Sequence, residues 1–155
     1  MSSKNIRISA KALIIENGKL LCIKKRDDDG YYHILPGGGQ RHEEPLTKTL
    51  KRECKEEMDA DVEVHELRLV WEYISNNHEF AEYDPDKHEH YLTFVCTLKD
   101  STTVKKGGTP DEDQVDVTWI ELDTLSEHRL YSKILRRLIT ETGEIAGSVY
   151  LGGVN

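Results

Sequence analysis

The chain has 155 residues, of which 37% are hydrophobic and 32% are charged, and its formal net charge is −8 at pH 7. This length suits one domain with a real core, which we take as residues 1–155. The acidic balance disfavours a dedicated binder of nucleic-acid polymers, and no apolar run approaches the ~20 residues that cross a bilayer membrane.

Cysteine usage indicates a reducing compartment. Three cysteines cannot all pair with one another; Cys22 and Cys96 lie in apolar stretches, and Cys54 lies beside an apolar helix stripe. The first residues carry no apolar segment of the kind that directs secretion. We therefore expect a cytoplasmic protein with reduced, mostly buried thiols.

The first elements in chain order are predicted to be strands. Ile and Leu are concentrated in residues 6–16 and 19–25, which flank Asn17-Gly18, a strong signal for a two-residue hairpin turn. Residues 27–30 are polar and predict a turn, and residues 32–35 predict a short strand.

Three consecutive glycines follow this strand. Gly37, Gly38 and Gly39 come directly after a proline and predict a loop whose backbone can approach a ligand closely. Their amide groups are suited to donate hydrogen bonds to phosphate oxygens. We therefore take these three glycines as candidate substrate-binding residues, although a glycine-rich loop alone is often only a turn.

Residues 44–58 predict a helix whose inward face becomes acidic. Pro45 suits the first turn, and no further Pro or Gly interrupts the run. At about 100° per residue, one narrow sector holds four side chains, with Cys54 beside it: Leu46, Leu50, Glu53 and Glu57. A charge is expensive on such a stripe unless it is paired, and clustered carboxylates favour a hard divalent cation.

The same geometry separates the roles of the charged residues. Glu53 and Glu57 face inward and are predicted to be metal ligands, with Glu56 beside them as a third ligand or the group that orients water. Arg52 lies further round and is predicted to brace the carboxylates, whereas Glu44 points nearly opposite and is interpreted as a supporting residue. A solvated acidic helix face is the alternative, but it does not explain why carboxylates continue the leucine stripe.

The remaining elements are predicted from periodicity and turn residues. They comprise strands at residues 62–74, 91–98 and 115–122, polar loops at 75–88 and 99–113, a short helical turn at 124–127, an amphipathic helix at 130–140 and an irregular C-terminus. His88 and His90, two residues apart, give only a weak indication of a transition metal, because no Cys or third well-spaced His accompanies them.

The glycine loop and the acidic helix together resemble a known motif. The pattern G-x5-E-x7-R-E-U-x-E-E-x-G-U, where U is a bulky apolar residue, is met by six charged or glycine positions: Gly38, Glu44, Arg52, Glu53, Glu56 and Glu57. The chain thus resembles the Nudix (MutT-like) hydrolases. Asp59 replaces the usual glycine and Ala60 a larger apolar residue; Asp tolerates the left-handed conformation, so we expect a costlier helix end but not a lost site.

The resemblance implies a fold and an activity. The fold would be an α/β Nudix-type sandwich, with a mixed β-sheet between helices and a loop-helix-loop metal site. The activity would be Mg²⁺- or Mn²⁺-dependent hydrolysis of a phosphoanhydride in a small nucleoside diphosphate derivative, and a homodimer is a further expectation. The alternatives are a non-catalytic Nudix-fold nucleotide sensor or scaffold, and an acidic module with a structural Ca²⁺ site.

The general base is left open by the sequence. Glu112, which precedes the last predicted strand, is the leading candidate outside the motif, and it completes a catalytic set with Glu53, Glu56 and Arg52. Three further acids compete with it: Glu79, Glu82 and Glu89. For each of these loop acids the simpler interpretation is a solvated side chain.

Overall fold

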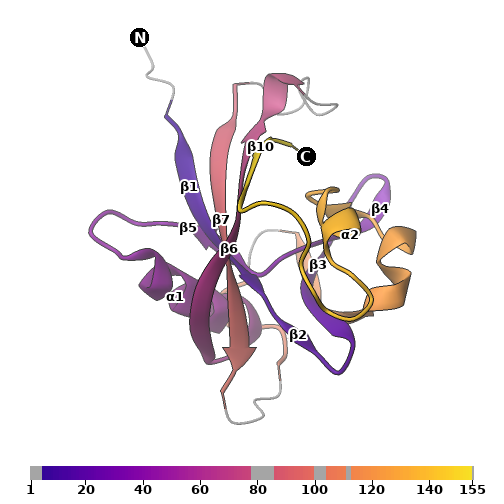
Figure 1. The fold of residues 1–155 in the computed structure, drawn as a ribbon. Helices are drawn as coiled ribbons and strands as arrows, with labels where there is room; N and C mark the ends of the chain where they lie inside the picture. The colour runs from indigo at the N-terminus through magenta and orange to yellow at the C-terminus, as the bar shows by residue number, and fades with distance from the viewer. Residues whose placement is uncertain (1–4, 78–85, 100–103, 111–112, 155) are drawn as a thin grey trace.

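The computed structural model describes residues 5–77, 86–99, 104–110 and 113–154, and the statements below refer to these residues. The strands are β1 (Arg7–Leu13), β2 (Ile15–Glu16), β3 (Lys19–Asp27), β4 (Gly30–Ile34), β5 (Gly37–Gly39), β6 (Val62–Ile74), β7 (His88–Leu98), β8 (Gln114–Glu121), β9 (Leu130–Tyr131) and β10 (Tyr150–Gly153). The helices are α1 (Leu46–Met58), α2 (Leu135–Leu138) and the 3-10 turns η1 (Ser75–Asn77) and η2 (Leu122–Glu127) (Figure 1).

The strands form two mixed sheets. One has the order β10-β6-β7-β1-β5, in which β1 pairs with β7 and β10 with β6 in parallel. The other runs β2-β3-β4-β9, with β8 added to β3 and with β4 parallel to β9. Helix α1 packs against the first sheet, and α2 and η2 lie on the other side of the molecule (Figure 1). The predicted α/β sandwich is confirmed, with two mixed sheets where one was expected.

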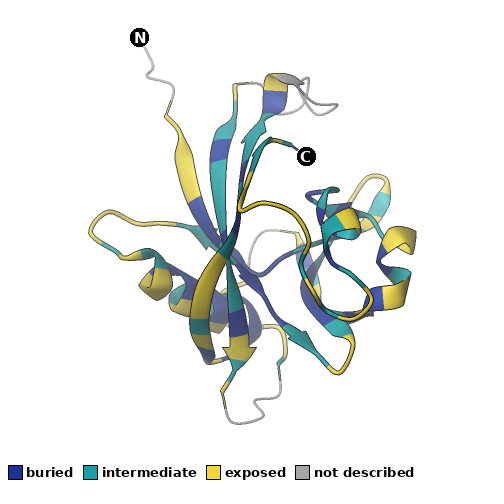
Figure 2. Ribbon diagram, viewed as in Figure 1, coloured by how far each residue is buried: buried dark blue, intermediate teal, exposed yellow. Residues whose placement is uncertain are grey.

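Strand β3 contributes side chains to two separate apolar cores. Its central residues are an unbroken apolar run, as expected of a strand that is buried on both faces. Leu20 and Cys22 lie in the core under η2 and α2, whereas Leu21 and Ile23 lie in the core that includes the inward face of α1. Figure 2 shows this burial as dark blue along β3 and along one face of α1.

The predicted hairpin turn is present between β2 and β3. Asn17 and Gly18 have φ angles of 52° and 74°, so both adopt the left-handed conformation that a tight hairpin with matching twist requires. The glycine segment, in contrast, differs from the predicted loop. Gly37–Gly39 forms the short edge strand β5, which pairs antiparallel with Ser9–Lys11 of β1.

The C-terminal third departs most from the sequence-based prediction. The helix predicted at 130–140 is reduced to Leu135–Leu138, because Leu130 and Tyr131 pair with β4 as the strand β9. The apolar pattern is still satisfied, since Leu130 and Leu135 are fully buried in one core. The end predicted to be irregular forms β10 beside β6. No helix among the described residues combines the length and apolar character that a membrane span needs.

Candidate active site

Helix α1 carries acidic side chains on its buried face, as the stripe predicted. Glu53 is 9% exposed and Glu57 is fully buried, in line with Leu50 and beside Cys54. Glu56 lies to one side and keeps 29% of its side chain exposed. Two carboxylates in an apolar sector therefore reach the interior, where a carboxylate must be paired or hydrogen-bonded to be stable.

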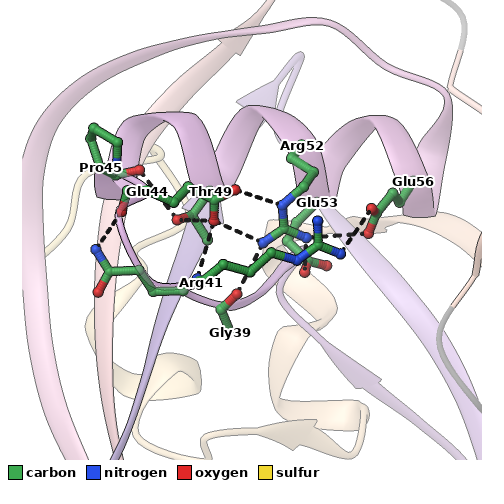
Figure 3. A network of polar contacts seen from close by, with 9 residues as sticks. Gly39, Arg41, Glu44, Pro45, Thr49, Arg52, Glu53 and Glu56 are labelled. Carbon is green, nitrogen blue, oxygen red and sulfur yellow. Dashed lines mark hydrogen bonds and ion pairs between the residues drawn. The ribbon is translucent and has the colours of Figure 1, made fainter.

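Arg52 connects the acids of this segment. Its Nη1 atom donates hydrogen bonds to Glu53 Oε1 at 2.8 Å and Glu56 Oε2 at 3.4 Å, and Nη2 donates to the carbonyl of Gly39 at 3.0 Å. Figure 3 shows the guanidinium among the carboxylates of Glu44, Glu53 and Glu56. The predicted bracing contacts are thus present, and they tie α1 to the glycine strand β5.

Glu44 lies just before α1 and holds the other edge of the Arg52 guanidinium. Its Oε1 atom also accepts hydrogen bonds from the Thr49 hydroxyl at 2.7 Å and the Arg41 amide at 3.3 Å. The Arg52 contact, followed by the Thr49 hydroxyl, lowers the pKa of the Glu44 carboxyl to about 2. The same pairing raises the pKa of Arg52 above its ordinary value. Glu44 therefore remains ionised at neutral pH and orients Arg52.

The glycine strand makes close contact with the buried acids. The Gly37 amide donates a hydrogen bond to Glu57 Oε1 at 2.8 Å. A Cβ atom at Gly38 would lie 2.5 Å from the Glu53 carboxyl carbon, so only glycine leaves room for that carboxylate. At least one glycine amide is thus directed at a carboxylate of α1. The predicted contact of Gly37, Gly38 and Gly39 with phosphate stays a prediction.

The end of α1 is intact despite Asp59. This residue adopts the left-handed conformation with φ 51° and caps the helix through its amide, which donates to the Lys55 carbonyl at 3.0 Å. Ala60 is fully buried in the α1 core. Beyond the cap, the Gly107 amide and the Gln114 side-chain amide donate to the Glu57 carbonyl at 2.8 and 3.0 Å. The last turn of α1 is therefore held by the segment that leads into β8.

A pocket of about 220 Å³ opens beside Gly38 and Glu53. Its lining comprises four cationic side chains, two tyrosines, two carboxylates, two glycines, one serine and one isoleucine: Arg7, Lys11, Lys25, Lys87, Tyr32, Tyr91, Glu53, Glu89, Gly37, Gly38, Ser9 and Ile34. Four of these side chains are cations in a chain of net charge −8, so positive charge is concentrated beside the Glu53 carboxylate of α1. The pocket is thus suited to an anion.

Sequence reasoning missed the four cationic residues that line this pocket. Arg7 and Lys11 lie on β1, Lys25 on β3 and Lys87 just before β7, so only tertiary structure brings them together. The one local signal is the alternation of Arg7, Ser9 and Lys11, which places their side chains on one face of a strand. This pattern of polar residues at every second position of an expected strand is the signal that could have identified these residues of β1.

Glu89 is the one competing acid that the structure describes. It is 3% exposed on β7, lines the pocket, accepts a hydrogen bond from the Tyr91 hydroxyl and lies 3.7 Å from Arg7. Burial, followed by the Glu89 charge, raises the pKa of Tyr91 above its ordinary value. The interpretation of Glu89 as a solvated loop acid is therefore wrong. Three candidates lie outside the described residues: Glu79, Glu82 and Glu112.

The residues present fit a hard divalent cation by two observations. The donors are carboxylates, two of them almost fully buried, and Gly38 leaves a space against Glu53 that a side chain would fill. In the structure Glu53 and Glu56 share Arg52 Nη1, and Glu57 accepts the Gly37 amide. An ion at these carboxylates would compete with those hydrogen bonds.

Comparison with known proteins identifies the family. The NUDIX domain model matches residues 6–143, and the chain therefore belongs to the Nudix hydrolase family. A search among curated proteins finds no significant match. The family membership agrees with the two mixed sheets, the position of α1 and the charged pattern between Gly38 and Glu57.

Solved structures support the fold. A NUDIX hydrolase from Nitrosomonas europaea aligns with a TM-score of 0.70 at 19% identity, covering 97% of this chain and 81% of that one. A UDP-X diphosphatase aligns at 0.65 and 20% identity, covering 97% and 69%. An ADP-ribose pyrophosphatase from Streptococcus suis aligns at 0.61 and 19% identity, covering 94% and 98%. At these identities the similarity establishes the fold and leaves the substrate open.

Proposed function

We propose that this protein hydrolyses a phosphoanhydride bond in a nucleoside diphosphate linked to another group, such as ADP-ribose or a nucleotide sugar. The proposed metal is Mg²⁺ or Mn²⁺, bound by Glu53, Glu56 and Glu57. The observation that carries this proposal is that the buried carboxylate Glu53 lines a pocket rich in Lys and Arg, whose Gly37 also donates a hydrogen bond to the buried Glu57. Two similar structures carry names of enzymes that act on such substrates, an ADP-ribose pyrophosphatase and a UDP-X diphosphatase.

Phosphoryl transfer needs positioning and charge stabilisation more than covalent chemistry. Arg7, Lys11 and Lys25 line the pocket and would neutralise phosphate oxygens there. The glycines let the substrate approach β5 closely. Arg52 acts as a positioning residue, because it orients Glu53 and Glu56 through its Nη1 hydrogen bonds. The bound ion would supply further charge neutralisation and an activated water.

The proposed general base accepts a proton from the water that attacks phosphorus. Glu112 remains our first candidate outside the motif, and Glu56 can orient water from within it. Glu89 is a second outside candidate, supported by its place in the pocket lining and by its burial. Turnover of Glu112→Gln and Glu89→Gln variants across pH separates the two, because loss of the base removes the acidic limb of the profile.

The non-catalytic alternative receives no support from the site. A sensor would tolerate loss of the charged positions, yet Arg52, Glu53, Glu56 and Glu57 are all present. The departures at Asp59 and Ala60 leave the helix end capped and buried. We therefore retain the hydrolase as the proposal, with one domain over residues 1–155, a cytoplasmic location and a homodimer as further proposals. Size-exclusion chromatography with light scattering tests the last of these.

The decisive experiment is a substrate panel. The protein is incubated with ADP-ribose, nucleotide sugars, dinucleoside polyphosphates and nucleoside triphosphates, with Mg²⁺, with Mn²⁺ and with chelator, and products are separated by ion-exchange chromatography. We expect metal-dependent cleavage of at least one compound into phosphate-containing products. Tight nucleotide binding without any cleavage would overturn the hydrolase proposal and favour the sensor.

A further inference from the structure

A second group of metal-ligating side chains lies on the sheet face opposite the pocket. Alternate residues of a strand point to opposite faces, so His88 and His90 face away from Glu89, which lines the pocket. Glu72 on β6 is directly opposite His90 in the antiparallel register and shares its face. Among the residues that the structure describes, this is the one set of three His, Cys, Asp or Glu whose ligand atoms converge within 4.8 Å of one another.

The geometry of this trio is compact. The Nε2 atoms of His88 and His90 lie 2.9 and 3.1 Å from the same carboxylate atom, Glu72 Oε1. The other carboxylate atom, Oε2, accepts a hydrogen bond from the Tyr150 hydroxyl of β10. Two imidazole nitrogens and a carboxylate oxygen therefore point at one small volume. Tyr150 holds the carboxylate by its other oxygen.

We propose that Glu72, His88 and His90 bind a transition-metal ion of the Zn²⁺ class, at a site separate from the carboxylates of α1. Imidazole nitrogen suits Zn²⁺ and its neighbours in the transition series, whereas Mg²⁺ prefers an all-oxygen shell. Two histidines and one glutamate form a known three-ligand zinc set that keeps a fourth position open. The side chains are 24%, 31% and 35% exposed, so an ion can reach them and water can complete its shell.

The surroundings favour metal binding over a simple hydrogen-bonded trio. Both Nε2 atoms are directed at one oxygen of Glu72, and a cation in that volume would contact all three groups at once. The Tyr150 hydroxyl donates a hydrogen bond to Glu72 Oε2, which fixes the carboxylate with Oε1 directed at the two imidazoles. The three cysteines are buried, so no exposed thiol competes for the ion. An ion here would fasten β6 to β7 and, through Tyr150, to β10.

The test measures metal binding directly and does not depend on hydrolysis. Metal-free full-length protein is titrated with Zn²⁺ against a chromophoric chelator, in a large excess of Mg²⁺ that occupies the carboxylates of α1. The same protein is titrated with Co²⁺ and followed by its visible ligand-field absorption. We expect tight Zn²⁺ binding and a Co²⁺ band of tetrahedral or five-coordinate type in the wild-type protein.

The variants locate the site. The double variant His88→Ala/His90→Ala should lose the Co²⁺ band and one equivalent of bound Zn²⁺, and Tyr150→Phe should weaken Zn²⁺ binding about tenfold. His65→Ala is the matched control, because His65 is an exposed histidine of β6 whose imidazole contacts Thr97 and no member of the trio.

Equal Zn²⁺ affinity in the wild-type and double-variant proteins, or a Co²⁺ band lost equally in His65→Ala, would overturn the proposal. If the double variant is unfolded by circular dichroism, Glu72→Gln replaces it, since this change keeps the shape of the side chain. Retention of the wild-type Zn²⁺ affinity by folded Glu72→Gln would likewise overturn it.

Discussion

Arg52 and Glu44 form a two-point ion pair across the start of α1. Arg52 Nε lies 2.8 Å from Glu44 Oε2, and Nη2 lies 2.9 Å from Oε1. Such parallel contacts fix the plane of a guanidinium, and a lysine ammonium does not reproduce them. The remaining nitrogen, Nη1, is thereby directed at Glu53 and Glu56. Glu44 thus controls the orientation of acids that it does not touch.

Glu44→Gln should impair turnover without removing any proposed metal ligand. The change weakens the hold on Arg52, and supporting contacts of this kind typically contribute about 10–100-fold in activity or metal affinity. Steady-state kinetics at varied Mg²⁺ on the best substrate of the panel measures the effect. Glu43→Gln is the matched control, because Glu43 is the preceding residue and its side chain is 86% exposed. Equal turnover in both variants would show that Glu44 has no role in orienting Arg52.

The same pair makes an acid-dependent contribution to stability. Pairing lowers the pKa of Glu44 from an ordinary value of 4.5 to about 2, so the folded state favours the ionised form. Its contribution is complete above the unfolded pKa and is lost as pH falls from about 4.5 towards about 2. Urea unfolding at stepped pH should therefore show wild-type protein losing its stability advantage over Glu44→Gln in that range. A difference that stays constant down to acid pH contradicts the assignment.

Gly38→Ala should disturb Glu53 specifically. The added Cβ would lie 2.5 Å from the Glu53 carboxyl carbon, and Gly38 is not among the glycines with positive φ, so the backbone itself tolerates alanine. We expect a folded protein with lower turnover and a higher Mg²⁺ requirement. Gly153→Ala is the control, since its Cβ would meet only Ile74 at an ordinary 3.9 Å. Unchanged Mg²⁺ dependence in the Gly38→Ala protein would show that Glu53 is not a metal ligand.

Glu57→Gln should abolish most activity while the fold persists. Glutamine keeps an oxygen that can accept the Gly37 amide, whose donor distance to Glu57 is 2.8 Å, but it removes the charge that a metal ligand supplies. Because supporting residues alone contribute about 10–100-fold, loss of a ligand should cost more than about 100-fold in turnover. Kinetics and circular dichroism on the same sample measure both outcomes. Normal activity in the folded variant would mean that the metal lies elsewhere.

Local sequence signals predicted the elements whose causes are local. Asn17-Gly18 specifies its hairpin through two positive φ angles, and the order of leucines and glutamates on α1 follows from helical geometry alone. The helix predicted at residues 130–140 is largely absent because the same apolar spacing can be buried by a strand as well as by a helix. Pairing of Leu130 with His33 of β4 outweighed the helical periodicity of the segment.

The pocket and the histidine trio depend on register between distant strands. Glu72 meets His90 only because β6 and β7 pair with register shifts between Val64 and Leu67 and between Leu67 and Leu69. Nothing in either strand alone specifies those irregularities, and a shift of one residue would turn Glu72 to the other face of the sheet. The two histidines therefore gave only a weak signal in the sequence, because strand pairing alone brings Glu72 to them.

Gly107→Ala tests whether the segment before β8 is fastened to α1. A Cβ at Gly107 would lie 2.1 Å from the backbone carbonyl oxygen of Glu56, whereas one at Gly108 would meet no atom within 4 Å, so Gly108→Ala is a matched control one residue away. To relieve this contact the segment must move, which breaks the 2.8 Å hydrogen bond from the Gly107 amide to Glu57. Overpacking of this kind costs about 1–3 kcal/mol, so urea unfolding should show Gly107→Ala less stable than Gly108→Ala by that amount. Because the proposed general base, Glu112, follows Gly107 in the sequence, we expect turnover to fall in Gly107→Ala alone. Equal stability and turnover in the two variants would contradict this prediction.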